Sequence, residues 1–249
     1  MTGLRIMSWN LRGAAKPRLD AVVEILQAHE PDVLALQEVR RGQARRVAGL
    51  LGWRRPAWAL KHNAYWPAWW LAEGLAILSH HRLAVHPPVV LTPELDRRTF
   101  RRRILLPAEV LFEDDQRVLV IDAHLSSGDD DELRVREAHH ILSILPGTLP
   151  TVLVGDLNAT PRAESIKVLI EGGCVDTWPA AAPPGEPGST YPANAPRRRI
   201  DYVMVNDAVN SGLRVVEVSV PDDLGEAMSG LSDHRPLLVQ LELPEPPGD

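Results

Sequence analysis

The sequence of 249 residues contains a single cysteine, Cys174, and no apolar run long enough to cross a bilayer. One thiol excludes an intramolecular disulfide and a thiolate zinc cluster, so any bound metal must take oxygen or imidazole ligands. The longest apolar stretches are far shorter than the ~20 residues of a membrane span, and Met1 to Arg5 lack the basic start of a signal peptide. We therefore expect a cytoplasmic protein without a transmembrane segment.

Lysine is also scarce, because Lys16, Lys61 and Lys167 are the only lysines among 27 basic residues, and the formal net charge is −6. Proteins that coat nucleic acid over a broad basic surface use many cations to release counterions, so this balance argues mildly against that class. It leaves room for a local basic groove. Genome composition explains the preference for arginine more simply than phosphate recognition does.

Hydrophobic residues make up 45% of the chain and charged residues 24%, as in ordinary soluble globular domains. Hydrophobic periodicity predicts strands at residues 4–9, 33–36, 75–78, 83–90, 104–111, 118–124, 151–154, 200–205, 213–220 and 237–243, and helices at 17–30, 44–51, 132–145 and 163–170. A loop rich in proline and glycine is predicted at 179–196. Two packed sheets with helices outside them are the expected arrangement, in one domain over residues 1–243 with a frayed tail at 244–249.

Ionisable or amide side chains stand at six ends of these predicted strands. Each alone is more often a turn former or a helix cap than a functional group. Six such ends in one chain are explained more simply by a single site at one edge of the sheets. The residues concerned are Asn10, Glu38, His124, Asp156 with Asn158, Asp201, and Asp233 with His234.

Metal-assisted phosphoester hydrolysis is the chemistry that uses such a set. Glu38 and Asp233 offer the carboxylate oxygens that Mg²⁺ prefers, and Mn²⁺ is the second candidate ion. A metal polarises the phosphoryl oxygen and offsets developing charge. Asp156 with Asn158 can orient a water molecule, and His234 paired with Asp201 can present a charged donor to the phosphate, so all three functions are available.

Four segments resemble the motifs of the endonuclease/exonuclease/phosphatase superfamily, which has the DNase I-like fold. They are Ser8-Trp9-Asn10, Leu36-Gln37-Glu38-Val39, Gly155-Asp156-Leu157-Asn158 and Ser232-Asp233-His234, in the order of the family and spread over nearly the whole chain. The resemblance implies a four-layered α/β sandwich, in which two central, mostly antiparallel sheets are flanked by helices. It also implies a hydrolytic site at one edge of the two sheets.

By the same resemblance, Glu38 is similar to the metal-binding glutamate, and Asn10 contacts the metal or the phosphate. Asp233 corresponds to the terminal aspartate on the metal side. The resemblance assigns the attacking water and the phosphate to Asp156 and Asn158, the catalytic histidine to His234, its orienting aspartate to Asp201 and the second histidine to His124. Asp122, on the same strand face as His124, departs from the asparagine often found there.

Three further residues are similar to substrate-side positions of the nuclease branch. Glu73 is placed like the acidic partner of the second histidine, with even odds against a simple charge at a strand end. Arg40 resembles a phosphate-contacting arginine, and an exposed arginine at a helix start fits equally well. Arg103, the last of an arginine run between residues 97 and 103, resembles a substrate-facing arginine, whereas such runs are usually solvated.

Five of the seven tryptophans lie between residues 53 and 70. We expect Trp53 and Trp58 to pack between a helix and a strand, and we expect Trp66, Trp69 and Trp70 to contact substrate. In a nuclease these rings would stack on bases; in an enzyme for lipid or small organic phosphates they would form an apolar wall. The expected protein is a monomer that acts on a phosphoester, with nucleic acid as the first candidate and a lipid or small phosphate as the alternative.

Overall fold

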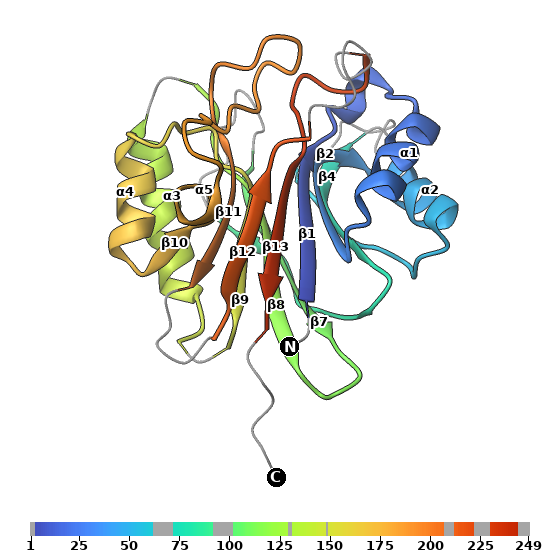
Figure 1. The fold of residues 1–249 in the computed structure, drawn as a ribbon, viewed down its shortest axis with the longest axis horizontal. Coiled ribbons are helices and arrows are strands. Elements are labelled where there is room, and N and C mark those ends of the chain that lie inside the picture. Colours follow the sequence, from blue (N-terminus) through green and yellow to red (C-terminus); the bar gives the residue numbers. More distant parts are fainter. Residues whose placement is uncertain are drawn as a thin grey trace.

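The computed structural model describes residues 3–61, 72–91, 102–128, 131–147, 149–206, 212–221 and 230–243. Within this part of the chain, two sheets pack face to face and helices cover their outer faces (Figure 1). The order of the first sheet is β12-β13-β1-β2-β4-β3, and that of the second is β10-β11-β9-β8-β7-β5, with β6 pairing to β7. The predicted four-layered α/β sandwich is confirmed.

The first sheet is built from the two ends of the described chain. Its strands are β1 (Gly3–Asn10), β2 (Val33–Arg40), β3 (Ala57–Leu60), β4 (Glu73–Ser79), β12 (Arg214–Ser219) and β13 (Leu237–Glu242). The second sheet contains β5 (Arg82–Val85), β6 (Val89–Val90), β7 (Ile104–Leu111), β8 (Arg117–His124), β9 (Thr151–Asp156), β10 (Cys174–Asp176) and β11 (Asp201–Asn206).

The helices divide between the two outer faces. Helices α1 (Leu19–His29) and α2 (Arg41–Leu51) lie on the first sheet, and α3 (Asp131–Ile144) and α4 (Glu164–Glu171) lie on the second (Figure 1). A short helix α5 (Thr177–Ala181) and a single 3₁₀ turn η1 (Gly13–Ala15) complete the set. None of the helices in the described part of the chain has the length and hydrophobicity to cross a lipid bilayer.

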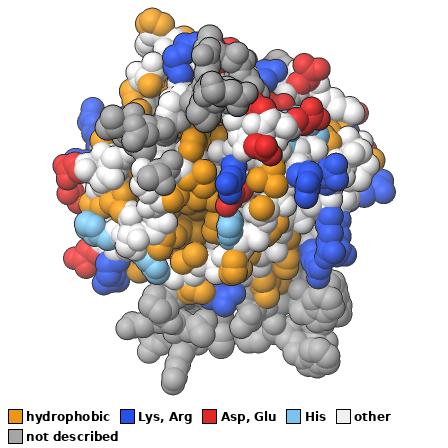
Figure 2. Space-filling view, turned by 90° about the horizontal axis from the view of Figure 1, so that it is seen from below, with side chains coloured by type: hydrophobic (Ala, Val, Ile, Leu, Met, Phe, Trp, Pro, Cys, Tyr) orange, Lys and Arg blue, Asp and Glu red, His pale blue; other side chains and the backbone are white. Residues whose placement is uncertain are grey.

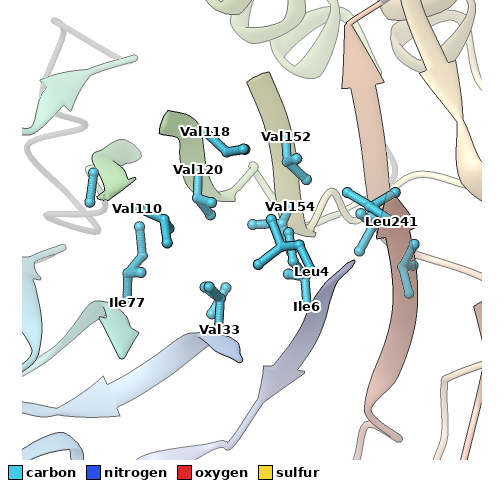
Figure 3. Close-up of a cluster of buried hydrophobic side chains, with 14 of the residues drawn as sticks. Leu4, Ile6, Val33, Ile77, Val110, Val118, Val120, Val152, Val154 and Leu241 are labelled. Atoms are coloured by element: carbon cyan, nitrogen blue, oxygen red, sulfur yellow. The ribbon is translucent and has the colours of Figure 1, made fainter. Parts of the chain in front are cut away.

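Apolar side chains fill the space between the two sheets. Val33 and Ile77 of the first sheet face Val118, Val120 and Val152 of the second, and all five are buried (Figure 3). Separate apolar clusters lie under the helices on each side. Because both sheets are covered on both faces, their central strands are apolar almost throughout. The polar residues in these strands lie at strand ends or are hydrogen-bonded in the interior.

The pairing is mostly antiparallel, with two parallel exceptions that position the site. Strand β1 pairs in parallel with β2, and β8 pairs in parallel with β9. In both cases a helix provides the crossover that parallel strands need. The carboxyl ends of these four strands consequently meet at one edge of the sandwich, as the strand-end residues predicted.

Local differences from the predicted elements have simple causes. The strand predicted over 83–90 is two strands, β5 and β6, because Pro87 and Pro88 between them have no amide hydrogen to donate. Strands β3 and β10 and helix α5 were not predicted, since three to five residues carry too little periodicity to recognise. Trp53 and Trp58 pack against the cluster under α1 and α2, as predicted. The predicted tail at 244–249 lies outside the described residues.

Candidate active site

Three of the predicted residues lie side by side across the second sheet. Asp156 ends β9, and the strand register pairs it with His124 on β8 and with Asp201 on β11. All three side chains are buried. Because paired residues on neighbouring strands point to the same face, the register alone aligns a histidine and two carboxylates in one row.

The first sheet contributes Asn10 and Glu38 opposite this row. Asn10 Nδ2 donates a hydrogen bond of 3.0 Å to Asp156 Oδ2, which joins the ends of β1 and β9. Asn10 Oδ1 accepts the amide hydrogen of Arg12 at 3.0 Å, so the orientation of the side-chain amide is fixed. Glu38 Oε1 lies 3.9 Å from His124 Nε2. The two sheets thus share one polar edge.

The backbone takes left-handed conformations at three positions of this edge. Glu38 has φ 52° and lies where the pairing of β2 with β4 shifts register. Asn158 has φ 51°, and its amide donates to Asp156 Oδ1 at 2.9 Å. Gly155 has φ 139°, and a Cβ atom there would lie 2.0 Å from the Ala123 carbonyl oxygen. Unfavourable backbone geometry concentrated in one place is typical of functional sites.

His234 and Asp201 form a buried pair. His234 Nδ1 lies 2.9 Å from Asp201 Oδ2, and its Nε2 lies 3.8 Å from Asp156 Oδ2. Burial lowers the pKa of His234, but the charges of Asp201, Asp156 and Asp233 outweigh it and raise that pKa to about 10. The ring therefore carries a proton at neutral pH, and its Nε2–H points toward the end of β9.

The pKa of Asp156 is also raised, which in a carboxyl group disfavours the charged form. Complete burial and the nearby charge of Asp201 raise its pKa to about 6. Asp156, Asp201 and His234 each offer a ligand atom, and these atoms lie within 4.8 Å of one another. The protonated His234, bonded to Asp201, has no free lone pair for a metal, whereas the carboxylates leave negative charge that a divalent cation bound through oxygen atoms would offset.

A polar pocket of about 270 Å³ opens over these side chains. Asp233 reaches its rim, where the carboxylate lies 3.5 Å from the Arg12 guanidinium. The Tyr191 ring lies 5.0 Å from the ring of His234, between centroids. The lining consists of Asn10, Glu38, His124, Ser127, Gly128, Asp156, Asn158, Tyr191, Arg198, Ile200, Asp233 and His234. The pocket thus contains seven of the eight predicted catalytic and metal-binding residues, and Asp201 lies directly beneath.

A buried lysine occupies the place predicted for an acidic partner of His124. Lys61 Nζ lies 2.9 Å from His124 Nδ1 and 4.0 Å from Glu38 Oε1. Burial, and next the charge of Arg103, lower the pKa of Lys61 to about 7. The predicted partner, Glu73, instead accepts a hydrogen bond from the Ala14 amide at 2.5 Å, so that pairing was wrong. Lys61 lies just after β3, opposite Glu73 on β4, and so takes the inner position.

Asp122 contacts the opposite sheet through Gln37. Gln37 Nε2 donates to Asp122 Oδ1 at 2.7 Å, and both side chains are buried. Among the described residues, neither Gln37 Oε1 nor Asp122 Oδ2 has a hydrogen-bond partner. Burial raises the pKa of Asp122 far above its ordinary value, although Gln37 and nearby backbone amides favour the charge. A proton on Oδ2 would supply the missing donor to Gln37 Oε1, so we interpret this as a neutral acid–amide pair.

A model of the Endonuclease/Exonuclease/phosphatase family matches residues 7–234, which run from β1 to His234. The chain belongs to this family. Members of the endonuclease/exonuclease/phosphatase family are metal-dependent hydrolytic phosphoesterases, and this chain carries acidic and histidine groups that could hold a metal ion. No curated protein sequence matches the chain.

Solved structures of the family share the fold over nearly the whole chain. An endonuclease/exonuclease/phosphatase from Beutenbergia cavernae DSM 12333 is 25% identical, with a TM-score of 0.81 over 98% of this chain and 72% of its own. A mannosyl-6-phosphatase from Bacteroides thetaiotaomicron VPI-5482 is 18% identical, with a TM-score of 0.73 over 96% of this chain and 100% of its own. The catalytic domain of human Nocturnin, with bound sulfate, is 18% identical, with a TM-score of 0.73 over 97% and 95%.

The described residues predicted to contact substrate lie farther from the pocket than the predicted catalytic and metal-binding residues do. Arg40 stands at the start of α2 and does not line the pocket, and neither does Glu73. Arg103 is buried beside the pocket wall, where its Nη2 donates to Ser127 Oγ at 3.3 Å. Arg103 does not line the pocket itself, and its charge acts on the neighbouring Lys61. The predicted substrate residues Trp66, Trp69 and Trp70 lie outside the described residues.

Sequence reasoning missed Lys61, Thr190 and Tyr191. Thr190 Oγ1 donates to Asp201 Oδ2, and Tyr191 follows it directly on the loop predicted only as rich in proline and glycine. The one available signal was that the loop carries threonine and tyrosine among its proline and glycine residues and is followed directly by three arginines, Arg197 to Arg199. Arg198, whose guanidinium lies 5.9 Å above the Tyr191 ring, completes this side of the pocket of the family site.

Proposed function

We propose that this protein is a divalent-metal-dependent phosphodiesterase that cleaves nucleic acid. The observation that carries the reaction type is the Asp201–His234 pair, whose imidazole Nε2 faces Asp156 inside a polar pocket. A protonated imidazole aimed into a carboxylate-rich pocket is suited to bind a phosphoryl oxygen and not to act as a free base.

The proposed metal is Mg²⁺, and Mn²⁺ is the alternative ion for the same site. The residues that would hold it are Glu38, Asn10 and Asp233, with Asp156 within reach, because all four line the pocket with oxygen atoms. When bound, the cation would polarise a phosphoryl oxygen and offset the charge that develops on it. The unbalanced negative charge of the buried carboxylates supports this assignment.

The protein side chains would divide the remaining work. Asp156, held by Asn10 and by the Asn158 amide, would take a proton from the attacking water as the water oxygen bonds to phosphorus. His234 would donate a hydrogen bond to a phosphoryl oxygen while the ester P–O bond breaks, and the leaving oxygen is released as a hydroxyl after it takes a proton from solvent. His124 would hold a second phosphoryl oxygen through Nε2.

Groups at the rim support a nucleic acid substrate. Arg12 is exposed beside Asp233 at the rim, Arg198 is exposed and lines the pocket, and the half-exposed Tyr191 ring contacts both Arg198 and His234. Cations spaced around a phosphate pocket can hold the phosphates before and after the scissile one, and an aromatic ring offers a stacking surface to a base. The charge of −6 is thus compatible with local phosphate binding.

A small organic phosphate is the second candidate substrate. The pocket volume of about 270 Å³ accommodates a phosphate with a compact attached group. One solved relative with the same fold is a mannosyl-6-phosphatase. This alternative predicts that a sugar phosphate, which is a phosphomonoester, is turned over faster than any phosphodiester.

The reaction type is tested by replacing His234 with alanine and Asp156 with asparagine. We expect each variant to lose ~10²-fold or more in kcat with Mg²⁺, because each removes a group that acts on the phosphate. The matched control is Asp114→Asn, an exposed carboxylate in the β7–β8 turn, which should retain full activity. Full activity in both site variants would contradict the proposal.

The substrate is tested with a panel of plasmid DNA, single-stranded RNA, sphingomyelin, a sugar phosphate and bis-p-nitrophenyl phosphate. Hydrolysis of DNA or RNA above all others, weakened by Tyr191→Ala or Arg198→Ala through KM, would support a nuclease. A Trp69→Ala/Trp70→Ala variant tests the predicted stacking in the same assay. Preference for the sugar phosphate would replace the nuclease proposal with the second candidate.

A further inference from the structure

A second group of metal-binding side chains lies at the opposite end of the sandwich from the pocket. Asp32 precedes β2, and His80 and His81 follow β4, where the chain crosses from the first sheet to the second. Their ligand atoms lie within 4.8 Å of one another. The distance to the pocket is on the order of 20 Å, because β2 and β4 run eight and seven residues between the two ends.

The carboxylate of Asp32 is held in a fixed orientation, with one oxygen atom directed toward the histidines. Its Oδ2 accepts the amide hydrogen of Arg5 at 2.7 Å, which fixes the side chain against β1. The other oxygen, Oδ1, lies 3.8 Å from His80 Nε2. One oxygen thus holds the side chain in place, and the other faces the imidazole.

Ser79 joins the two segments that carry the ligands. Its hydroxyl donates to the Asp32 carbonyl oxygen at 2.7 Å and accepts from the His81 amide at 3.0 Å. The serine is buried, so these bonds are shielded from water. The backbones on both sides of the group are consequently held at fixed separation, as ordered metal sites require.

The two imidazole rings are held between aromatic side chains. The ring centroid of Trp53 lies 6.0 Å from that of His80, the two imidazoles are 4.1 Å apart, and His81 lies 4.7 Å from Phe112. Burial and the neighbouring His80 lower the pKa of His81. Neutral imidazole is the form that binds metals, and adjacent rings this close disfavour double protonation.

An open cavity of about 810 Å³ adjoins the histidines and gives access from solvent. It is lined by acidic residues such as Glu113 and Asp115 as well as by arginines such as Arg82 and Arg117. Arg54 also lines the cavity, so the lining carries three arginines and two carboxylates. Histidine side chains also reach the surface on the face at this end of the molecule, which Figure 2 views from below.

We propose that Asp32, His80 and His81 form a binding site for Zn²⁺ or a similar late first-row dication. Zn²⁺ takes imidazole nitrogen and carboxylate oxygen at ~2.0 to 2.2 Å, so two ligands on a tetrahedral centre are about 3.4 Å apart. The observed atoms need to move inward by about 1 Å, which the half-exposed His80 permits. Water from the cavity completes the coordination. Mg²⁺ prefers oxygen ligands, so this site and the pocket select different ions.

Bound metal would fasten the start of β2 to the crossover between the sheets. Asp32 belongs to the first sheet, whereas the residues after His81 begin β5 of the second. A shared cation would add a link between the sheets where the backbone crosses. We therefore expect Zn²⁺ to stabilise the folded protein without any requirement for substrate.

The test is Zn²⁺ binding to the intact protein, measured by calorimetry in excess Mg²⁺, together with the visible absorption spectrum of the Co²⁺ form. The main variant is His80→Asn, which alters the half-exposed ligand and is least able to disturb folding. Asp32→Asn is the second variant, since the amide oxygen can still accept from Arg5. His139→Asn is the control, because His139 is exposed on α3 next to another histidine, His140.

The expected result is a Zn²⁺ site that persists in a Glu38→Gln/Asp233→Asn double variant, in which two of the proposed metal ligands of the pocket are altered. Affinity at this site should fall about ten-fold or more in His80→Asn and in Asp32→Asn and stay unchanged in His139→Asn. The nitrogen-ligated Co²⁺ spectrum should need a higher Co²⁺ concentration in both variants and should change in shape in His80→Asn, which removes one imidazole. Equal Zn²⁺ affinity in wild type and both ligand variants, or Zn²⁺ binding that the Glu38→Gln/Asp233→Asn variant abolishes, would overturn the proposal.

Discussion

Asp122 offers a sharp test of the neutral acid–amide pair, because asparagine reproduces the protonated carboxyl group in shape and in hydrogen bonding. In Asp122→Asn, Oδ1 still accepts from Gln37 Nε2, and Nδ2 can donate to Gln37 Oε1, which has no partner among the described residues. In Asp122→Ala, Gln37 Nε2 loses its shortest hydrogen bond and keeps only the longer ones to Ser8 Oγ at 3.4 Å and to the Ala35 carbonyl oxygen at 3.3 Å. The two substitutions should therefore have opposite effects on stability.

The magnitude follows from burial and from proton linkage. Loss of the strongest hydrogen bond of a buried amide, with a cavity left in place of the carboxyl group, costs about 1 to 3 kcal/mol, so Asp122→Ala should lower the Tm by several degrees at every pH. In the wild type, burial raises the pKa of Asp122 in the folded state, so the folded protein binds more protons than the unfolded chain. This contribution to stability is complete below the unfolded pKa of about 4 and is lost by ~1.4 kcal/mol per pH unit as pH rises to the folded pKa.

Urea unfolding of the wild type and of Asp122→Asn between pH 5 and pH 8 measures this effect. The advantage of the asparagine variant should grow with pH, because the variant has no proton to lose at this position. Asp122→Ala provides the reference for a broken pair. A stability difference that does not change with pH, or an asparagine variant as unstable as the alanine variant, would refute the neutral pair.

Three further predictions concern the pocket and its support. Lys61→Met should raise the Tm by a few degrees in calorimetry and lower kcat, because it removes a buried cation together with a polar partner of the site. Asp201→Asn should lower the pKa of His234 from about 10 toward its ordinary value, so the kcat/KM profile should lose activity at a lower pH on its alkaline side. Gly155→Ala should lower the Tm by about 10 °C or prevent folding, whereas Gly49→Ala, in open space on α2, should be neutral or slightly stabilising in the same thermal scan.

The residues that meet at the edge of the sandwich were predicted well, because the ends of strands can be recognised in the sequence. A polar residue after an apolar run, such as Asn10 or Asp156, leaves a signal, and the crossover rule then brings such ends together. The resemblance to the family assigned the pairing of Asp201 with His234, and their atoms are in contact. What these residues share is that chain order and strand direction alone place them.

The contacts that the sequence did not predict depend on which of several neighbouring side chains is buried beside the site. Lys61 and Glu73 lie opposite each other on neighbouring strands, and charge alone favours the glutamate as the partner of His124. Three-dimensional packing places the lysine inside, where burial lowers its pKa. No one-dimensional pattern marks a single lysine after a four-residue strand as buried, so this contact was beyond prediction from the sequence.

The hydrogen bond from Trp9 Nε1 to the carbonyl oxygen of His234, at 3.0 Å, ties together two residues 225 positions apart. The pocket is therefore closed by residues from both extremes of the family match. A growing chain that has emerged only as far as β11 would already contain β9 and α3 and yet would have an incomplete pocket. We therefore expect the proposed activity to begin only at a late step of biosynthesis, when the segment around His234 docks onto β1, and we expect a chain truncated before that segment to be inactive toward phosphoesters.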